Sequence, residues 1–126
     1  MKRTLILLLI LASSLFAKVE WRDMFDAYDE AEASNKLVMV MLSREGCPGC
    51  EYMKSVVFED KKVSKLLHDG FISVELDVGE DFIPENLEYF ATPSFYFLDT
   101  NEKVLKRVNG GEKAKDFIKT LEALKR

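Results

Sequence analysis

Cys47 and Cys50 are the only two cysteines in 126 residues, and two residues separate them. Residues 36–42, before the pair, form a short and largely apolar run that predicts a buried strand. Residues 51–58, after the pair, predict a helix. A Cys-x-x-Cys pair between a strand and a helix indicates redox chemistry of the two thiols.

The first 17 residues have the pattern of a secretory signal peptide. Two basic residues, Lys2 and Arg3, precede an apolar run over residues 5–12, and the small residue Ala17 marks the expected cleavage site. The nearly continuous apolar stretch over residues 5–16 has about a dozen residues, which is short of the ~20 that a membrane-spanning helix needs. An uncleaved membrane anchor is the alternative interpretation. We expect a mature domain of residues 18–126 in the periplasm, where disulfides persist.

The composition fits one domain and excludes one class of partner. A length of 126 residues with 48% apolar residues is enough for one hydrophobic core. The chain has 18 basic and 22 acidic residues, a net charge of −4, and no basic block beyond Lys61 and Lys62. Because binding to nucleic acid requires a basic patch, we do not expect nucleic acid as a partner. The protein is expected to be a monomer.

Two amphipathic helices are expected in the first half of the chain. The helix after the cysteines should bury Met53, Val56 and Val57. The first helix is expected to end at Asn35, since asparagine tolerates the left-handed conformation of a C-cap. Its expected buried face consists of five residues at helical spacing: Trp21, Met24, Phe25, Tyr28 and Ala31.

Strands and helices alternate through the rest of the chain. Asp60 is a good N-cap for a third helix that ends near Gly70. Residues 84–90 predict one or two helical turns, and a terminal helix follows Gly110. Strands are expected at residues 71–78, with one buried face, and at residues 93–98 and 103–108, joined as a hairpin. This order predicts an α/β fold in which helices flank both faces of a mixed β-sheet of about four to five strands.

Three motifs resemble the thioredoxin superfamily. They are Cys-Pro-Gly-Cys at residues 47–50 after an apolar strand, Thr92-Pro93 at the start of a later strand, and Gly110-Gly111 before the terminal helix. A closer similarity is to the C-terminal domain of the DsbD-type thiol-disulfide reductase and to small exported relatives. Five parts of the sequence carry it: Trp21 and residues 36–38, 57–60, 71–77 and 92–95. The resemblance covers nearly all of the mature chain and implies a thioredoxin-like fold.

The position of each cysteine suggests its role. A cysteine at a helix N-terminus lies beside unpaired N–H groups and the positive end of the helix dipole, which lower the thiol pKa from ~8.5 toward ~7 or below. Cys47 is therefore the expected nucleophile. Cys50, one turn further along, is placed to resolve the mixed disulfide. Pro48 suits the first helical position, where its missing N–H costs nothing.

The resemblance also implies a substrate site around these cysteines. Pro93 should follow a cis peptide bond, and the backbone of Thr92 should face Cys47 and pair with an extended substrate chain. Pro48 and Gly49 complete the expected substrate-binding residues.

Several residues depart from the thioredoxin pattern. Gly46 replaces the usual tryptophan before the first cysteine, and the dipeptide between the cysteines is Pro-Gly instead of Gly-Pro. Met41 takes the place of a buried aspartate that relays protons to the resolving cysteine. Glu45 is the candidate replacement for that acid, and a carboxylate that merely solubilises the loop is the alternative. Ser55 replaces a kinking proline, which predicts a straighter helix.

These expectations point to an exported thiol-disulfide oxidoreductase that acts on exported proteins carrying cysteines or disulfides. The residues leave reduction, oxidation and isomerisation open, and the similarity to the DsbD-type reductase implies a reductase. A reductase in an oxidising compartment needs electrons, so we expect a membrane-embedded thiol donor as a partner. No cofactor or metal is expected, because a soft metal site needs four ligands and His68 is the only other candidate. His68 is expected to be a solvated residue near a helix end.

Two alternatives stay open. The cysteines could form a structural disulfide, although the short loop they close would constrain the unfolded chain little. The chain could equally be a non-enzymatic binding or assembly protein that uses the fold as a scaffold. The aromatic residues Phe95, Tyr96 and Phe97 are expected in the core, and not in a substrate groove.

Overall fold

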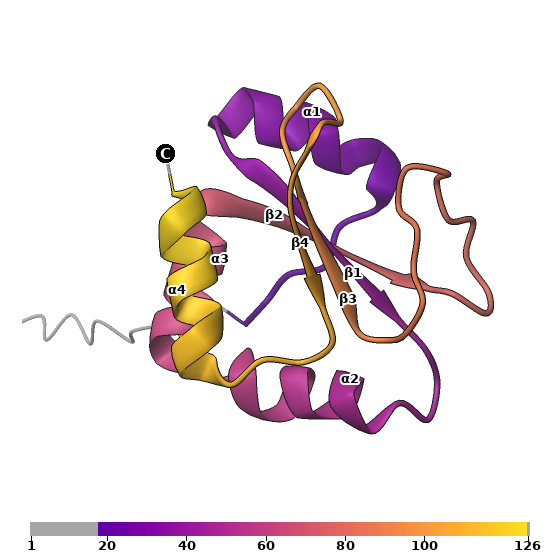
Figure 1. The fold of residues 1–126 in the computed structure, drawn as a ribbon. Helices are drawn as coiled ribbons and strands as arrows, with labels where there is room; N and C mark the ends of the chain where they lie inside the picture. The colour runs from indigo at the N-terminus through magenta and orange to yellow at the C-terminus, as the bar shows by residue number, and fades with distance from the viewer. Residues whose placement is uncertain (1–17, 126) are drawn as a thin grey trace, which may run out of the picture.

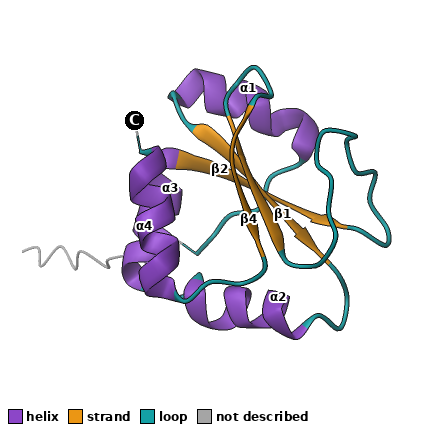
Figure 2. Ribbon diagram, in the orientation of Figure 1, coloured by secondary structure: helices purple, strands orange, loops and turns teal. Residues whose placement is uncertain are grey.

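The computed structural model describes residues 18–125. Its elements in chain order are α1 (Met24–Ser34), β1 (Leu37–Ser43), α2 (Pro48–Tyr52), η1 (Met53–Val57), α3 (Lys61–Gly70), β2 (Phe71–Asp77), β3 (Ser94–Leu98), β4 (Val104–Asn109) and α4 (Ala114–Leu124). The strands form a four-stranded sheet in the order β2-β1-β3-β4, with β1 parallel to β2 and antiparallel to β3. α1 covers one face, and α2, α3 and α4 lie on the other (Figure 1; Figure 2). The predicted α/β fold with a mixed sheet between helices is confirmed.

β1 lies in the middle of the molecule, and all of its side chains are buried. They alternate between two cores. The core under α1 includes Val38, Val40 and Leu42, and the core under the other helices includes Met39 and Met41. A nearly continuous apolar run is what a strand needs when both of its faces are covered.

β2 is buried on both faces along most of its length, whereas its sequence predicts one buried face. Ile72, Val74 and Leu76 belong to the core under α1, as expected from their spacing. Phe71 lies in the other core, and Ser73, which points to the same side as Phe71, is 5% exposed. The period-two pattern of apolar residues does not predict this second buried face, because Ser73 is polar. Its neighbours nevertheless shield it from water.

The first helix starts later than its apolar spacing suggests. Asp23 caps it by accepting a hydrogen bond from the N–H of Phe25, and Asn35 closes it with φ of 54°. Trp21 lies before the helix and pairs with Ser73 of β2. The predicted helical face is therefore partly wrong: Phe25 is 91% exposed, and Ala27 is buried in its place. Counting the spacing from Trp21 included residues that are not helical.

The helix after the cysteines is not α-helical throughout. α2 continues directly into η1, a π-helical turn in which the N–H of Phe58 donates to the carbonyl oxygen of Met53, five residues earlier. The wider turn rotates the following side chains relative to an α-helix. Met53 and Val57 are buried as predicted, but Val56 is 50% exposed.

Residues 84–90 form a loop and not the predicted helical turns. A single turn closes where the N–H of Leu87 donates to the carbonyl oxygen of Pro84. Leu87 fills the core under α1, and the hydroxyl of Tyr96 donates to the carbonyl oxygen of Glu88. Leu87 and the hydrogen bond from Tyr96 both hold the loop in place, and Tyr89 packs against the same core. Within residues 18–125, no helix has the length and apolar character needed to cross a membrane.

A cluster of aromatic rings fills the core beneath the cysteine pair. The ring centroids of Phe95 and Phe117 are 5.2 Å apart, and Phe58 lies 5.9 Å from Phe117 and 6.2 Å from Phe95. Such tilted ring pairs contribute about 0.5–1.5 kcal/mol each beyond the area they bury. Phe97 is also fully buried, so the predicted place of the β3 aromatics in the core is confirmed.

Candidate active site

The two cysteines lie where the chain leaves β1 and enters α2. A turn over residues 44–46 connects the two elements, and its last residue, Gly46, has φ of 72°. A side chain there would meet no heavy atom within 4 Å, so space does not require glycine. The left-handed conformation favours glycine at this position.

Cys47 and Cys50 are joined by a disulfide, with their Cα atoms 5.3 Å apart. Cys47 is the N-cap of α2, and its Sγ accepts a hydrogen bond from the N–H of Cys50 at 3.2 Å. Pro48 occupies the first turn of the helix, where its missing N–H leaves no acceptor unsatisfied. Cys47 is 8% exposed and Cys50 2% exposed, so Cys47 is the more accessible of the two.

The Thr92-Pro93 segment lies against this helix start, although more than 40 residues separate the two in sequence. The Thr92–Pro93 peptide bond is cis. The hydroxyl of Thr92 donates to Sγ of Cys47 at 3.4 Å, a side-chain contact that sequence reasoning did not foresee. An added Cβ on Gly49 would lie 3.0 Å from Cδ of Pro93, so the absence of a side chain on Gly49 lets the two segments approach.

Gly110 and Gly111, which precede α4, lie beside Pro93 and the start of α2. The N–H of Gly110, which has φ of 82°, donates to the carbonyl oxygen of Pro93 at 2.8 Å. A Cβ added at Gly111 would lie 3.7 Å from Sδ of Met53 and 3.8 Å from the carbonyl oxygen of Gly49. The predicted site residues at 47–50 and 92–93 are thus brought together, with this glycine pair beside them.

Glu45 stands apart from this group. Its side chain is exposed in the turn before Cys47, and no hydrogen bond or ion pair of its carboxylate is found within residues 18–125. Met41 is fully buried in the core that also contains both cysteines, so no carboxylate occupies that position beneath them.

A charged pair lies one strand away from Met41 and was missed in the sequence. Glu75 of β2 is the register partner of Met41, so its side chain projects from the same face of the sheet. Lys54 of η1 places its Nζ 2.5 Å from Oε2 of Glu75, an oxygen that is closed to solvent. A signal did exist, because Glu75 is the one charged residue between Ile72 and Leu76 in an otherwise uncharged strand segment.

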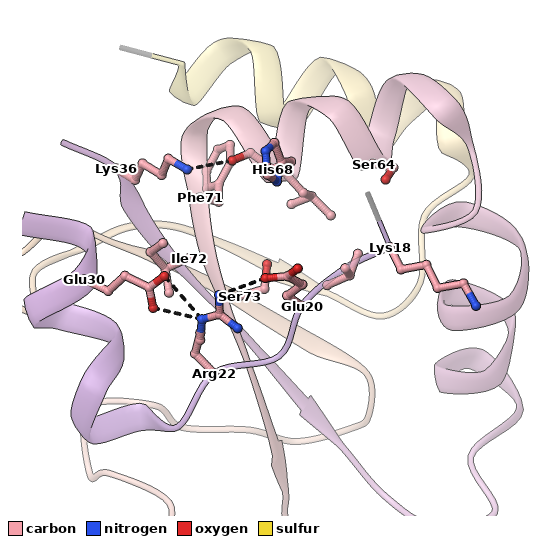
Figure 3. A pocket seen from close by; sticks show the side chains of 12 residues that line it. Lys18, Glu20, Arg22, Glu30, Lys36, Ser64, His68, Phe71, Ile72 and Ser73 are labelled. Atoms are coloured by element: carbon pink, nitrogen blue, oxygen red, sulfur yellow. Dashed lines mark hydrogen bonds and ion pairs between the residues drawn. The ribbon is translucent and has the colours of Figure 1, made fainter. Parts of the chain in front are cut away.

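Metal ligands do not gather around the cysteines. Within residues 18–125, no group of three or more histidine, cysteine, aspartate or glutamate residues could hold a metal ion. His68 is exposed at the end of α3, and its carbonyl oxygen accepts a hydrogen bond from Nζ of Lys36 at 2.8 Å (Figure 3). It borders a small pocket of about 110 Å³ between α3, β2 and the segment before α1, which neither cysteine lines.

Several solved structures share the fold of this chain. The solution structure of a thioredoxin from Thermus thermophilus is 27% identical, with 85% of this chain and 87% of that chain covered and a TM-score of 0.71. The oxidised C-terminal domain of Neisseria meningitidis DsbD is 19% identical, with 82% and 97% covered and a TM-score of 0.63. A DsbH oxidoreductase is 17% identical, with 86% and 88% covered and a TM-score of 0.67.

The family assignment agrees with these structural similarities. The model of the thioredoxin-like domain family matches residues 24–125, which include every helix and strand described above. With a match of that extent, the chain belongs to the thioredoxin-like domain family.

Proposed function

We propose that this protein is a thiol-disulfide oxidoreductase that reduces disulfides of exported proteins, with Cys47 as the nucleophile and Cys50 as the resolving cysteine. The observation that carries the proposal is the position of Cys47 Sγ. It sits at the start of α2, accepts a hydrogen bond from the N–H of Cys50, and lies 3.4 Å from the hydroxyl of Thr92. Two donors and a helix N-terminus around one sulfur favour its thiolate form.

The reaction starts from the dithiol. The Cys47 thiolate attacks one sulfur of a substrate disulfide, which forms a mixed disulfide and releases the other substrate sulfur as a thiolate. Cys50 then loses its proton and attacks Sγ of Cys47, which frees the second substrate thiol and forms the disulfide of this structure. Two electrons pass from the protein to the substrate, and an external thiol donor returns them.

Substrate contacts are assigned to the residues around the pair. The main chain of Thr92 pairs with an extended substrate strand, and Pro93, Pro48 and Gly49 form the surface beside the attacked sulfur. The close approach of Gly49 to Pro93 supports this arrangement. Glu45 is the proposed proton acceptor for Cys50, and its exposed position means that such a transfer would run through solvent.

The proposal also states that the protein reduces its substrates and that it lies in the periplasm. The predicted signal peptide at residues 1–17 lies outside the described residues, and it is the basis for placing the protein in the periplasm. The similarity to the DsbD C-terminal domain supports a reductase that receives electrons from a membrane-embedded thiol donor. In a compartment where disulfides persist, such a supply is needed to keep the dithiol reduced.

The decisive experiment is a trap. Replacing Cys50 by Ala leaves Cys47 unable to release a bound substrate, so mixed disulfides with exported proteins should accumulate. Cys47→Ala is the matched control and should accumulate none. If the folded Cys50→Ala protein captures no partner, the oxidoreductase proposal is wrong and the scaffold alternative holds. Equilibration with glutathione gives a second readout, because a reduction potential well below about −300 mV indicates a structural disulfide.

A further inference from the structure

β2 is an edge strand, and the segment before α1 covers only its first half. Trp21 forms a bridge with Ser73, and the N–H of Arg22 donates to the carbonyl oxygen of Ser73 at 2.8 Å. The guanidinium of Arg22 is held between Glu20 at 2.8 Å and Glu30 at 2.9 Å (Figure 3). The chain then turns away into α1 and leaves the edge.

The second half of the edge has unpaired main-chain groups. Along a strand these groups point alternately to either side, so the N–H and C=O of Glu75 face outward as those of Ser73 do. At Asp77 the outward N–H donates to Oδ2 of Asp81 at 2.7 Å. Between these two points, no segment of residues 18–125 pairs with the main chain of Glu75. An open edge of this kind accepts a further strand.

A groove of about 620 Å³ lies beside the open edge. Its floor includes Val74 and Leu76 of β2 and Tyr28 of α1. Two exposed aromatic side chains line it, Phe25 of α1 at 91% exposed and Phe82 of the loop after β2 at 84% exposed. Large apolar side chains left this exposed around a hollow are typical of an interaction surface.

The groove is negatively charged. Asp23, Asp81 and Glu102 line it, and Arg22 is the only basic lining residue within the described part of the chain. The charge of Arg22 is already offset by its two glutamate partners. Burial, together with the charges of Glu102 and Asp99, raises the pKa of Tyr28 at the floor to about 12, in line with a negative potential. A positively charged occupant is therefore favoured.

We propose that this groove binds an extended segment of a partner protein as an added strand on the edge of β2, with basic and apolar residues together on the face that points into the groove. Main-chain hydrogen bonds to Glu75 hold the segment in register. On that face its apolar side chains pack on Phe25 and Phe82, and lysine or arginine side chains two residues along the segment approach Asp81 and Glu102. The cysteines take no part, so this binding goes beyond the proposed thiol exchange.

The first test uses a cysteine-free heptapeptide, Val-Ser-Lys-Ser-Val-Ser-Lys, which carries valine and lysine on one face of a strand, titrated into the oxidised protein and followed by amide NMR. Shifts should concentrate at Val74, Glu75 and Phe82, and amide exchange at Glu75 should slow. The peptide Val-Ser-Glu-Ser-Val-Ser-Glu is the matched control and should not bind. The proposal is overturned if the shifts lie elsewhere, if both peptides bind alike, or if neither binds at about 1 mM.

The second test uses substitutions that do not disturb the core. Replacing Phe25 and Phe82 together by Ser should weaken binding of the lysine peptide about tenfold. Phe90→Ser is the matched control, because Phe90 is 88% exposed but lies outside the groove, and should leave the affinity unchanged. Equal affinity in all three proteins would contradict the proposal. Concentration-dependent dimerisation that the double substitution abolishes would identify a second copy as the occupant instead.

Discussion

The hydroxyl of Thr92 donates a hydrogen bond to Sγ of Cys47 at 3.4 Å, which links the segment before the cis proline directly to the proposed nucleophile. In the reduced protein the same hydroxyl is placed to donate to a thiolate. A donor of this kind favours the charged form of the sulfur. Thr92 therefore has two proposed roles. Its main chain pairs with the substrate, and its hydroxyl donates a hydrogen bond to Cys47.

Replacing Thr92 by Val removes this donor and keeps the shape of the side chain. We expect the pKa of Cys47 in the reduced protein to rise, because the thiolate loses a hydrogen-bond donor that stabilises its charge. The ultraviolet absorbance of the thiolate against pH measures it. Thr92→Ser keeps the hydroxyl and should titrate close to the wild type. Identical curves for the two variants would show that the hydroxyl has no influence on the sulfur.

Gly49 and Gly70 provide a comparison between two helical glycines. A Cβ on Gly49 would lie 3.0 Å from Cδ of Pro93, whereas a Cβ on Gly70 would meet nothing within 4 Å. Gly70→Ala should stabilise the protein by about 0.5–1 kcal/mol through the unfolded chain and helix propensity. Gly49→Ala should lose that gain, because Pro93 must shift. Denaturant unfolding measures both, and an equal gain in the two variants would contradict the close approach.

Tyr28 should make stability depend on alkaline pH. Burial is the main cause that raises its pKa from 10 to about 12 in the folded protein, with Glu102 and Asp99 contributing. The folded state therefore keeps a proton that the unfolded state releases, and this stabilisation is present below about pH 10 and lost toward pH 12. Between these values, the free energy of unfolding should fall more steeply for the wild type than for Tyr28→Phe. Parallel pH profiles would refute the assignment.

The predictable parts of the fold are those that residues close in sequence determine. Asp60 caps α3 and Asn35 closes α1 as expected, because a cap depends on one side chain and the turn beside it. The π-helical turn at η1 was not predictable, since no period in the sequence marks the extra residue that turns Val56 outward. Phe25 was misassigned because the start of α1 had to be known first.

The candidate site also has residues that local sequence identifies and contacts that only the packed fold determines. Cys47 and Cys50 could be identified from their spacing, and Thr92 from the motif it shares with Pro93. The contact between the Thr92 hydroxyl and Cys47 depends on how the loop over residues 84–93 is packed, which local patterns do not specify. A candidate acid sought near the cysteines in sequence led to Glu45, while the charged pair on their side of the sheet comes from η1 and β2.

That pair, Lys54 and Glu75, gives a prediction on stability. Oε2 of Glu75 is closed to solvent, and Nζ of Lys54 at 2.5 Å is the cation that compensates it. Lys54→Met keeps the length of the side chain but leaves the carboxylate uncompensated, so we expect a loss of about 1–2 kcal/mol in the free energy of unfolding. The loss stays in this range because both side chains keep some solvent contact.

Lys62 supplies the matched control for Lys54. Its Nζ lies 3.0 Å from Glu122, and both side chains of this pair are largely exposed. Lys62→Met should therefore change stability by less than about 0.5 kcal/mol, as is usual for surface ion pairs. Urea unfolding gives the free energy of unfolding of the two variants. A larger loss for Lys54→Met shows that Glu75 needs its cation, whereas water can solvate Glu122. Equal losses would mean that Glu75 is solvated in the folded protein and that its burial beside the cysteine core does not require Lys54.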